Sequence, residues 1–406
     1  MSLFIYEAAD KEGKVVVGEI NALNSESVAS SLAQKNLTPV KIELKTEAES
    51  RSFKSKNILE RFTTQDKIVL IRNLAATVKA GLSLNEALDI LIADSSKKIV
   101  GTFLIDAQFN IQNGQPLSTA FENNRRYFPP LFVGLIKAGE ASGRLDNSLE
   151  ELSRHLTKEH ELVKKVKSAM AYPLILIGAS IAIVTLMLIF VLPKLTKSFE
   201  QNNLELPLLT RILMNFSSAL TYSLFLDFAI VAALVGFFLY FRKTPRGKRV
   251  ISYLLFHTPV VKNLVKKIIL VRFARTLGTL IDSALPISES LNLTAKAVGN
   301  DRYEEAIARA DKEIRSGIPL SQALRNDPEL FPKFLVSLVG VGEKTGTLGQ
   351  VLKNFADFYD NDVDTALKDL TTFLEPILLL FMGLMIGTIA MAILMPIYQM
   401  TGSFNY

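Results

Sequence analysis

Gly114-Gln115-Pro116-Leu117-Ser118 returns as Gly317-Ile318-Pro319-Leu320-Ser321, 203 positions further along the chain. Gly139-Glu140-Ala141-Ser142-Gly143 returns at the same offset as Gly342-Glu343-Lys344-Thr345-Gly346. The offset also links four widely spaced pairs: Arg72 and Arg275, Glu86 and Glu289, Pro173 and Pro376, and Pro193 and Pro396. Chance does not hold one offset so far without an insertion or deletion, so the pattern indicates a duplicated unit. We expect two like domains that pack on each other or on another subunit.

The composition favours a membrane protein. Hydrophobic residues make up 49% of the 406 residues, and the mean hydropathy is +0.26. Cysteine is absent, which excludes a disulfide framework, a thiolate metal site and a thiol nucleophile. Residues 1–7 lack the basic start and the apolar run of a signal peptide, so we expect the first domain to stay in the cytoplasm.

The cytoplasmic segments are separated by their composition and periodicity. Residues 1–45 predict a small α+β module with a helix from Ser25 to Gln34. Its expected strands are Phe4 to Ala8, Val15 to Ile20 and Val40 to Leu44. Residues 46–62 are polar and predict a linker, and 63–170 carry helical periodicity and predict the first helical repeat. A basic segment and the second helical repeat occupy 242–375.

Three apolar stretches predict membrane-spanning helices at 171–193, 222–241 and 376–397. No charged residue occurs from Ser168 to Pro193, which is long enough to cross about 30 Å of hydrocarbon. A short periplasmic loop is expected at 194–221 and a periplasmic tail at 398–406.

The charges that flank these stretches predict their orientation. Residues 242–275 hold ten Lys or Arg and no Asp or Glu, whereas residues 194–227 hold three of each sign. Positive residues mark the cytoplasmic side of a membrane. We therefore expect both repeats and the N-terminus in the cytoplasm, and the C-terminus outside, in a multi-pass membrane protein.

The sequence contains candidate chemical motifs, and most of them do not fit the chemistry that they resemble. The run from Gly340 to Gly346 resembles a phosphate loop, but its Glu343 would repel phosphate, and we expect a tight helix–turn–helix joint without nucleotide. His155 and His160 stand five positions apart and turn away from each other, which favours a solvated helix face over a metal site. A weak divalent site at Glu150 and Glu151, where subunits meet, stays open. We expect no catalytic residue, cofactor or metal.

The basic residues of 242–275 also predict a partner. They lack interleaved aromatic residues and follow a membrane span, which favours contact with anionic lipid and control of topology over nucleic-acid binding.

The motifs resemble those of the GspF/PilC family, the inner-membrane platform proteins of type II secretion and type IV pilus machines. They are Ala80 to Leu84 with Glu86 to Leu88, Ala138 to Leu145, Ala171 to Pro173, Leu206-Pro207 with Thr210, Arg272 to Leu277, Gly342-Glu343 with Gly346, and Glu375-Pro376. One departure is that Ala284 stands where the first copy has the turn glycine Gly81.

The resemblance implies a non-enzymatic assembly platform for a type IV pilus, located in a bacterial inner membrane. It implies partners as well: a hexameric assembly or retraction ATPase, pilin or pseudopilin subunits, other inner-membrane alignment components and further copies of the chain. The equivalent platform of a type II secretion pseudopilus is the alternative. A transporter or channel is remote, because Asp227 is the only charged residue within the second apolar stretch. A signalling scaffold anchored in the membrane is a further possibility.

These expectations combine into one fold class and one mechanism. The fold is a mainly α polytopic membrane protein with two homologous cytoplasmic helical bundles, three transmembrane helices and the N-terminal α+β module. Each repeat should feed a helix of about 70 Å into the membrane, from Leu145 to Pro193 and from Leu348 to Pro396. Glu140 and Glu343 are candidate contacts for basic groups of the ATPase or of a neighbouring copy, or else parts of a structural joint.

The candidate membrane residues are four prolines and one aspartate. Pro173 and Pro376 lie near the inner boundary, where each should kink its helix or mark its entry, and Pro193 and Pro396 lie near the outer ends. Asp227 near the outer boundary is an interfacial aspartate or a polar contact for a pilin helix.

Overall fold

The computed structural model describes residues 2–9, 15–22, 38–44, 61–194 and 259–403, with a few single residues between them. The expected linker up to residue 60, Asp227, nearly all of the expected second span and the final residues 404–406 lie outside the described residues. Along the expected periplasmic loop and the start of the basic segment, only single residues and the short run 210–213 are described. The bundles and the two long helices can therefore be analysed in detail.

The N-terminal segment forms a three-stranded antiparallel sheet. Its strands are β1 (Ser2–Ala9), β2 (Val15–Ala22) and β3 (Thr38–Leu44), in the order β2-β1-β3. Each strand covers one of the three segments for which a strand was expected. The helix expected from Ser25 to Gln34 lies outside the described residues, apart from Ser27.

The first copy is a bundle of short helices followed by one long helix. Its elements are α3 (Thr64–Lys79), α4 (Leu84–Asp94), α5 (Lys98–Gln112), α6 (Leu117–Asn123), α7 (Pro130–Ser142) and α8 (Leu145–Leu186). Capping boxes begin two of them: Thr63 and Asp66 bond reciprocally at α3, and Ser83 and Glu86 at α4.

The second copy repeats this bundle. Its elements are α13 (Pro259–Asp282), α14 (Ile287–Ala297), α15 (Asp301–Arg315), α16 (Leu320–Arg325), α17 (Lys333–Thr345) and α18 (Leu348–Ser403). The last five helices of each copy begin 203 positions apart, as the sequence offset predicts. Gly81 has a φ of 88°, and Ala284 at the equivalent position has a φ of 61°. The second turn therefore keeps the left-handed conformation without a glycine, although this conformation costs an alanine about 1–2 kcal/mol.

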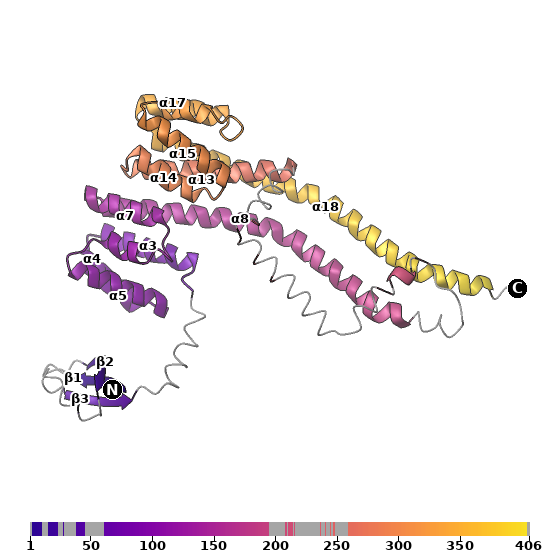
Figure 1. Cartoon of the computed structure of the whole chain (residues 1–406), viewed down its shortest axis with the longest axis horizontal. Coiled ribbons are helices and arrows are strands. Elements are labelled where there is room, and N and C mark those ends of the chain that lie inside the picture. The colour runs from indigo at the N-terminus through magenta and orange to yellow at the C-terminus, as the bar shows by residue number, and fades with distance from the viewer. Residues whose placement is uncertain are drawn as a thin grey trace.

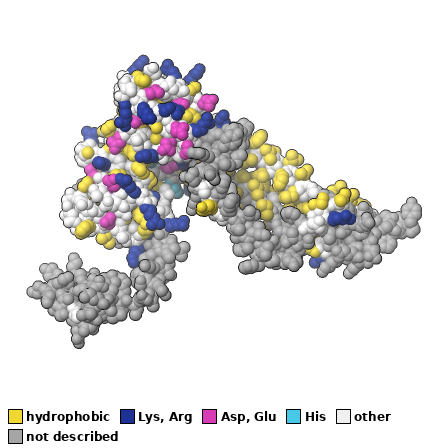
Figure 2. All heavy atoms as spheres, viewed as in Figure 1, with side chains coloured by type: hydrophobic (Ala, Val, Ile, Leu, Met, Phe, Trp, Pro, Cys, Tyr) yellow, Lys and Arg dark blue, Asp and Glu magenta, His cyan; other side chains and the backbone are white. Residues whose placement is uncertain are grey.

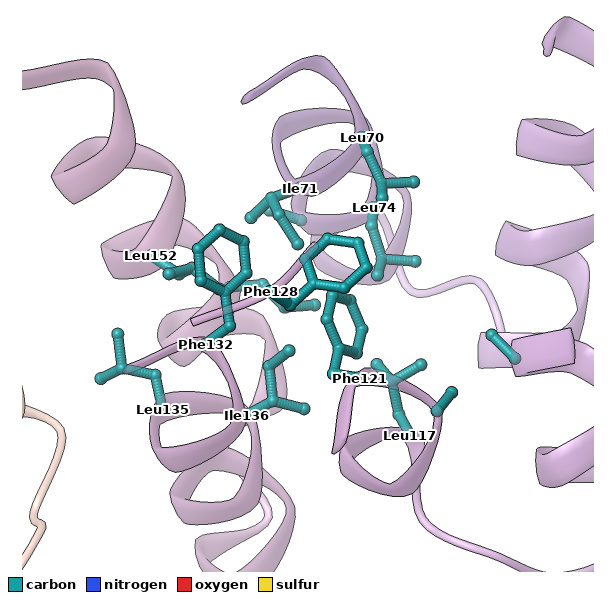
Figure 3. Close-up of a cluster of buried hydrophobic side chains, with 14 of the residues drawn as sticks. Leu70, Ile71, Leu74, Leu117, Phe121, Phe128, Phe132, Leu135, Ile136 and Leu152 are labelled. Atoms are coloured by element: carbon teal, nitrogen blue, oxygen red, sulfur yellow. The ribbon is translucent and has the colours of Figure 1, made fainter. Parts of the chain in front are cut away.

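Each copy has its own apolar core. In the first copy, three phenylalanines meet Leu70, Ile71 and Leu74 of α3, as Figure 3 shows. They are Phe121 of α6, Phe128 of the turn that follows it, and Phe132 of α7. In the second copy, Phe273, Tyr303, Phe331 and Phe355 are almost fully buried. Burial of a side chain of this size contributes about 2–3 kcal/mol, so either core can hold its bundle together.

Two helices leave the bundles side by side and run in one direction (Figure 1). α8 passes through the π-helical turn η1 (Met187–Val191) and the helical conformation continues to Lys194. Within the described residues, Leu145–Lys194 and Leu348–Met395 are long and apolar enough to span a membrane, with peak mean hydropathies of 2.9 and 2.6. Their apolar windows are only 11% buried, unlike the core helix of a soluble protein, which supports membrane insertion.

Candidate functional site

The joint between α7 and α8 is a left-handed turn that the second copy repeats between α17 and α18. Gly143 has a φ of 66° and Gly346 of 71°. The amide of Arg144 donates to the carbonyl of Gly139 at 2.9 Å, and that of Thr347 to the carbonyl of Gly342 at 3.0 Å. This bond closes the end of the short helix, and glycine meets the positive φ without a steric penalty.

Gly139 and Gly342 are glycines for a second reason, the close approach of the next helix. A Cβ on Gly139 would lie 2.7 Å from the Cβ of Ser148, and a Cβ on Gly342 would lie 2.9 Å from the Cα of Leu348. Real Cβ atoms do not approach so closely. Both joints are therefore tight packing points.

Glu140 and Glu343 cap a short helix within their own copy. Glu140 of α7 accepts hydrogen bonds from the backbone amides of Leu117 and Ser118, at the start of α6. Glu343 accepts from Leu320 and from Ser321, the latter at 3.1 Å, at the start of α16. A charged acceptor at a helix N-terminus is favourable because those amides lack partners within the helix.

The identity of the N-cap residue explains why this cap comes from another helix. Pro116 and Pro319 stand at the N-cap of α6 and α16, where neither side chain can accept a hydrogen bond. The expectation that the carboxylates of Glu140 and Glu343 are free to meet a partner is therefore wrong. Of the two alternatives, the geometry favours the structural joint.

A charged seam joins the copies along α8. We define it as the ion pairs between side chains of α8 and those of α13 and α18. Its shorter contacts are Arg272 to Glu159 at 2.6 Å, Lys353 to Glu151 at 2.7 Å, and Lys165 to Asp360 and Asp364 at 2.8 and 2.9 Å. Lys158 to Asp357 at 3.8 Å extends it. An apolar cluster that includes Leu162 of α8, Val271 of α13 and Leu367 of α18 extends the contact beyond the ion pairs.

The lysines of the seam hold their protons firmly. Burial by itself lowers the pKa of Lys353, but hydrogen bonds to Asp282 and Glu151 outweigh it and leave the pKa above its usual value. The pKa of Lys165 is raised in the same way, because the bonds to Asp360 and Asp364 exceed the effect of burial. Both lysines are therefore charged across the physiological pH range.

His155 lies inside the seam and is buried, so the expectation of a solvated face is wrong for this histidine. The second copy packs onto its side of α8, which the sequence of α8 alone does not reveal. Burial, and then the positive charge of Arg275, lowers the pKa of His155 to about 4. His155 is therefore neutral at pH 7, while His160 stays half-buried.

The seam borders a hollow of about 260 Å³, lined by charged residues that include Glu151, Lys158, Arg275 and Asp357. Among the described residues no group of three acidic, histidine or cysteine side chains could hold a metal ion. Glu150 contacts Lys79 at 2.6 Å and Glu151 contacts Lys353, so within one chain both carboxylates are paired with lysines.

Part of the basic segment has a role different from the lipid contact that was expected. Lys267 lies 3.7 Å from Asp362, and Arg272 and Arg275 face acidic residues of α8 and α18. Lys266 donates to the carbonyl of Glu329 at 2.6 Å. The charges nearest the bundle are thus used within the molecule. Figure 2 shows charged side chains over the bundles and hydrophobic ones along the long helices.

The prolines predicted as pivots lie inside long helices. Pro173 lies within α8, and Pro376 and Pro396 lie within α18, with helix on both sides, so none marks a helix entry. Tyr172 donates to Glu375 at 3.5 Å, which sets Pro173 and Pro376 at the same level of the helix pair. Pro193 follows the π-helical turn, whose wider register suits a residue without an amide proton.

The charge patterns of the two long helices contain a signal for the seam. Glu151, Lys158 and Lys165 recur every seven residues, and Lys353, Asp357, Asp360 and Asp364 alternate by four and three. Such spacing is typical of two parallel helices in contact. Comparison of these two patterns would have indicated the pairing of α8 with α18.

The architecture defines a class: an α-helical membrane protein in which two like bundles each continue into a helix of membrane-spanning length. The chain belongs to the family described as "Type II secretion system (T2SS), protein F", whose profile matches residues 70–193 and 273–396. The N-terminal domain of that family matches residues 1–43. The two matched segments are equal in length and begin 203 positions apart, which is the offset of the duplication.

Relatives with two kinds of name cover the whole chain. A "Type IV pilus assembly protein PilC" of Myxococcus xanthus is 33% identical over 99% of this chain and 96% of its own length. A protein of the same name from Thermus thermophilus is 32% identical over the full length of both. A "Type II secretion system protein F" of Pseudomonas aeruginosa is 29% identical over 98% of this chain and 99% of its own.

Proposed function

We propose that the chain is the inner-membrane assembly platform of a type IV pilus, which couples a cytoplasmic assembly or retraction ATPase to insertion or extraction of pilin subunits. Relatives named for pilus assembly support this role. The equivalent platform of a type II secretion system is the alternative, because a relative with that name matches nearly as well.

One observation carries the proposal: the two bundles continue without a break into two parallel apolar helices. A continuous helix transmits displacement along its axis, provided that its inner end is held. The joints at Gly139 and Gly342 and the caps from Glu140 and Glu343 hold those ends. A rotation or tilt imposed on the bundles by an ATPase then moves both membrane segments.

The charged seam makes the two helices move together. Its ion pairs span α8 from Glu151 to Lys165, about 20 Å of helix at 1.5 Å per residue. A single long helix would bend at Pro173, whereas a pair clamped on the bundle side of that proline delivers one common displacement. Pilin subunits would meet the apolar helices beyond Pro173 and Pro376, which are exposed along most of their length.

The proposal includes an orientation. Three spans, a cytoplasmic N-terminus and an external C-terminus follow from the charges at 194–227 and 242–275. A reporter active only outside the cytoplasm, fused after Tyr406, should be active, and the same reporter fused after Thr345 should be silent. Activity of a cytoplasm-specific reporter after Tyr406 would contradict this orientation.

We infer a role without catalysis of its own. Purified protein should not hydrolyse ATP, since Lys344 is exposed at the end of α17 and the neighbouring carboxylate of Glu343 faces a helix N-terminus. Hydrolysis that persists through purification and disappears in Lys344→Ala would contradict this.

Deletion of the gene in its source organism, with complementation by the full chain, tests the proposal and its alternative. The expected result is loss of surface pili with protein secretion unchanged, together with recovery of the ATPase and pilins on the purified protein. Loss of secretion with pili intact would select the alternative. Pili and secretion that both stay at wild-type levels would contradict both roles.

A further inference from the structure

The contact between the two copies uses different faces of the two bundles. On the first copy, Gly134 of α7 lies against α14, since a Cβ there would be 2.7 Å from Cδ1 of Leu293 and 3.7 Å from Cδ2 of Leu285. Leu131 and Ala138 lie one turn to either side of Gly134. His155 and Arg275 line the same hollow between the two copies. We call Leu131, Gly134, Ala138 and His155 face A, and Leu285, Leu293 and Arg275 face B.

Each copy also carries the equivalent of the face that the other copy uses. Face A recurs on the second copy, 203 positions on, as Phe334, Ser337, Val341 and Phe358. Its three hydrophobic members are 51%, 54% and 56% exposed, in that order. Face B corresponds on the first copy to Leu82, Ile90 and Arg72, where Leu82 is 37% exposed and Ile90 49%. Each bundle thus leaves one apolar face uncovered.

The uncovered faces show that the copies are not related by a two-fold axis. Under a two-fold axis, Ile90 would contact Ser337 just as Leu293 contacts Gly134, and both would be buried. Both are exposed instead. The long helices agree, because they use different faces. The α8 residues of the seam are Glu151, Lys158 and Lys165, whereas the α18 residues correspond to positions 150, 154, 157 and 161 of the first copy. The contact is head-to-tail.

We propose that a second copy of this chain covers these faces, so that the first bundle of one chain docks on the second bundle of the next. The contact between chains would repeat the contact already made within each chain. Ile90 would meet Ser337 in place of Leu293 and Gly134, and Arg72 would meet Phe358 in place of Arg275 and His155. The inference concerns self-association and stands independently of the proposed function.

The side chains on the two uncovered faces are complementary. Lys165 and Asp364 form an ion pair within the chain, and their equivalents in the other copy are Lys368 and Glu161. The contact between chains would therefore contain a pair of the same two charges. In the proposed contact, Arg72 would lie over the ring of Phe358 and form a cation–π contact. Elsewhere Asn354 would face Glu150, and Asn361 would face Arg154. No like charges oppose each other at these positions.

The repeated contact is confined to the part of the bundles away from the apolar helices. Nearer to them, Leu162 and Leu367 form an apolar layer within the chain, but their equivalents are Thr365 and Lys164. A head-to-tail contact either closes into a ring or continues as a filament. Because α8 and α18 run in one direction, a ring about the membrane normal keeps every long helix directed at the membrane.

Cysteine cross-linking tests the proposal without background, since the chain has no cysteine. One tagged chain carries Ser337→Cys and a second, differently tagged chain carries Ile90→Cys, both co-expressed in membranes and oxidised. The expected product contains both tags at the mass of two chains. Phe109→Cys on α5, 65% exposed, is the matched control partner for Ser337→Cys and should give no product.

A second variant separates docking from random collision. Phe358→Asp in the Ser337→Cys chain should lower the yield of the Ser337–Ile90 product about tenfold, because it buries a charge at the centre of the contact. Phe109→Asp should leave the yield unchanged. Absence of the product, equal yield from the control pair, or a cross-link formed within a single chain would overturn the proposal.

Discussion

The same pair of positions carries opposite charges in the two copies. In the first copy Lys79 at the end of α3 contacts Glu150 of α8 at 2.6 Å. In the second copy Asp282 and Lys353 stand at those positions and lie 2.8 Å apart. The two copies thus have opposite charges at both positions, but each copy keeps an ion pair there. The attraction between the two positions is conserved, whereas the residue types are not. Lys353 also reaches Glu151 of the first copy. The equivalent of Lys353, Glu150, pairs only with Lys79 and Arg154 of its own copy among the described contacts.

The joints differ from the seam in how they diverged. Each joint serves its own copy, and its two glycines, its glutamate and its hydrogen bonds are the same in both. The seam joins two copies that were once alike, and its faces became unlike: His155 of α8 corresponds to Phe358 of α18. Contacts within a domain are therefore the same in both copies, whereas the contact between the domains has given the two copies different residues.

The largest expected effect falls on the joints and should be equal in the two copies. Gly139→Val and Gly342→Val each drive a Cβ into the following helix, against the Cβ of Ser148 and the Cα of Leu348. Neither atom can move aside as the end of a long, flexible side chain can. Each should lower the free energy of unfolding by about 3 kcal/mol or more. Thermal unfolding in detergent measures this, with Gly178→Val as the control because nothing lies within 4 Å of a Cβ there. A large loss in only one copy would contradict the equivalence.

Removal of Lys353 should destabilise the protein more than removal of Lys79, because only Lys353 also takes part in the seam. Lys353→Ala leaves two partly buried carboxylates, Glu151 and Asp282, facing each other, and we expect a loss of about 2 kcal/mol. Lys79→Ala removes a pair whose lysine is 61% exposed, and such pairs contribute about 0–1 kcal/mol. Chemical denaturation of the two variants compares them. Equal losses would mean that the seam adds nothing to an ordinary surface pair.

His155 should make the seam sensitive to acid. Its folded pKa of about 4 lies below the unfolded value near 6.5, so the unfolded state binds the proton first and stability falls with the pH between these values. From pH 7 to pH 5 the loss should be about 2 kcal/mol. His155→Phe, the residue of the second copy, should lose less over that range. An unchanged pH profile would show that His155 does not carry this dependence.

The carboxylates at the joints should have a smaller effect, and on stability rather than on partner binding. Glu140→Gln and Glu343→Gln keep an acceptor but lose its charge at the helix N-terminus, and each should cost about 1 kcal/mol. Circular dichroism on heating measures both variants. Wild-type stability with loss of a cytoplasmic partner would instead restore the partner-contact role considered from the sequence.

Much of the fold could be predicted from the sequence because the relevant signals are local. The offset of 203 positions, the glycines at the joints and the uncharged stretch ending at Pro193 predicted the duplication, the turns and one apolar helix. These features depend on residues close in sequence or on composition, so one chain is enough to find them.

The seam is not a local signal, because its partners are more than 100 residues apart and only a comparison of the charge patterns of α8 and α18 indicates it. The burial of His155 depends on α13 and α18, and nothing in the sequence of α8 announces it. Glu140 was misjudged for a similar reason: its partners are backbone amides, which the side-chain pattern does not mark, beside a proline that cannot cap its own helix.

The central claim is that the seam clamps the two helices into one body that acts on the membrane. Charge reversal at its shortest pair tests it: Glu159→Arg, Arg272→Glu and the double variant, assayed for pilus assembly in the source organism or for secretion if that is the chain's role. Each single variant sets like charges about 3 Å apart and should abolish assembly while the protein remains in the membrane, and the double variant should restore it. Full assembly in both single variants, or no recovery in the double variant of a protein present at normal levels, would contradict the clamp.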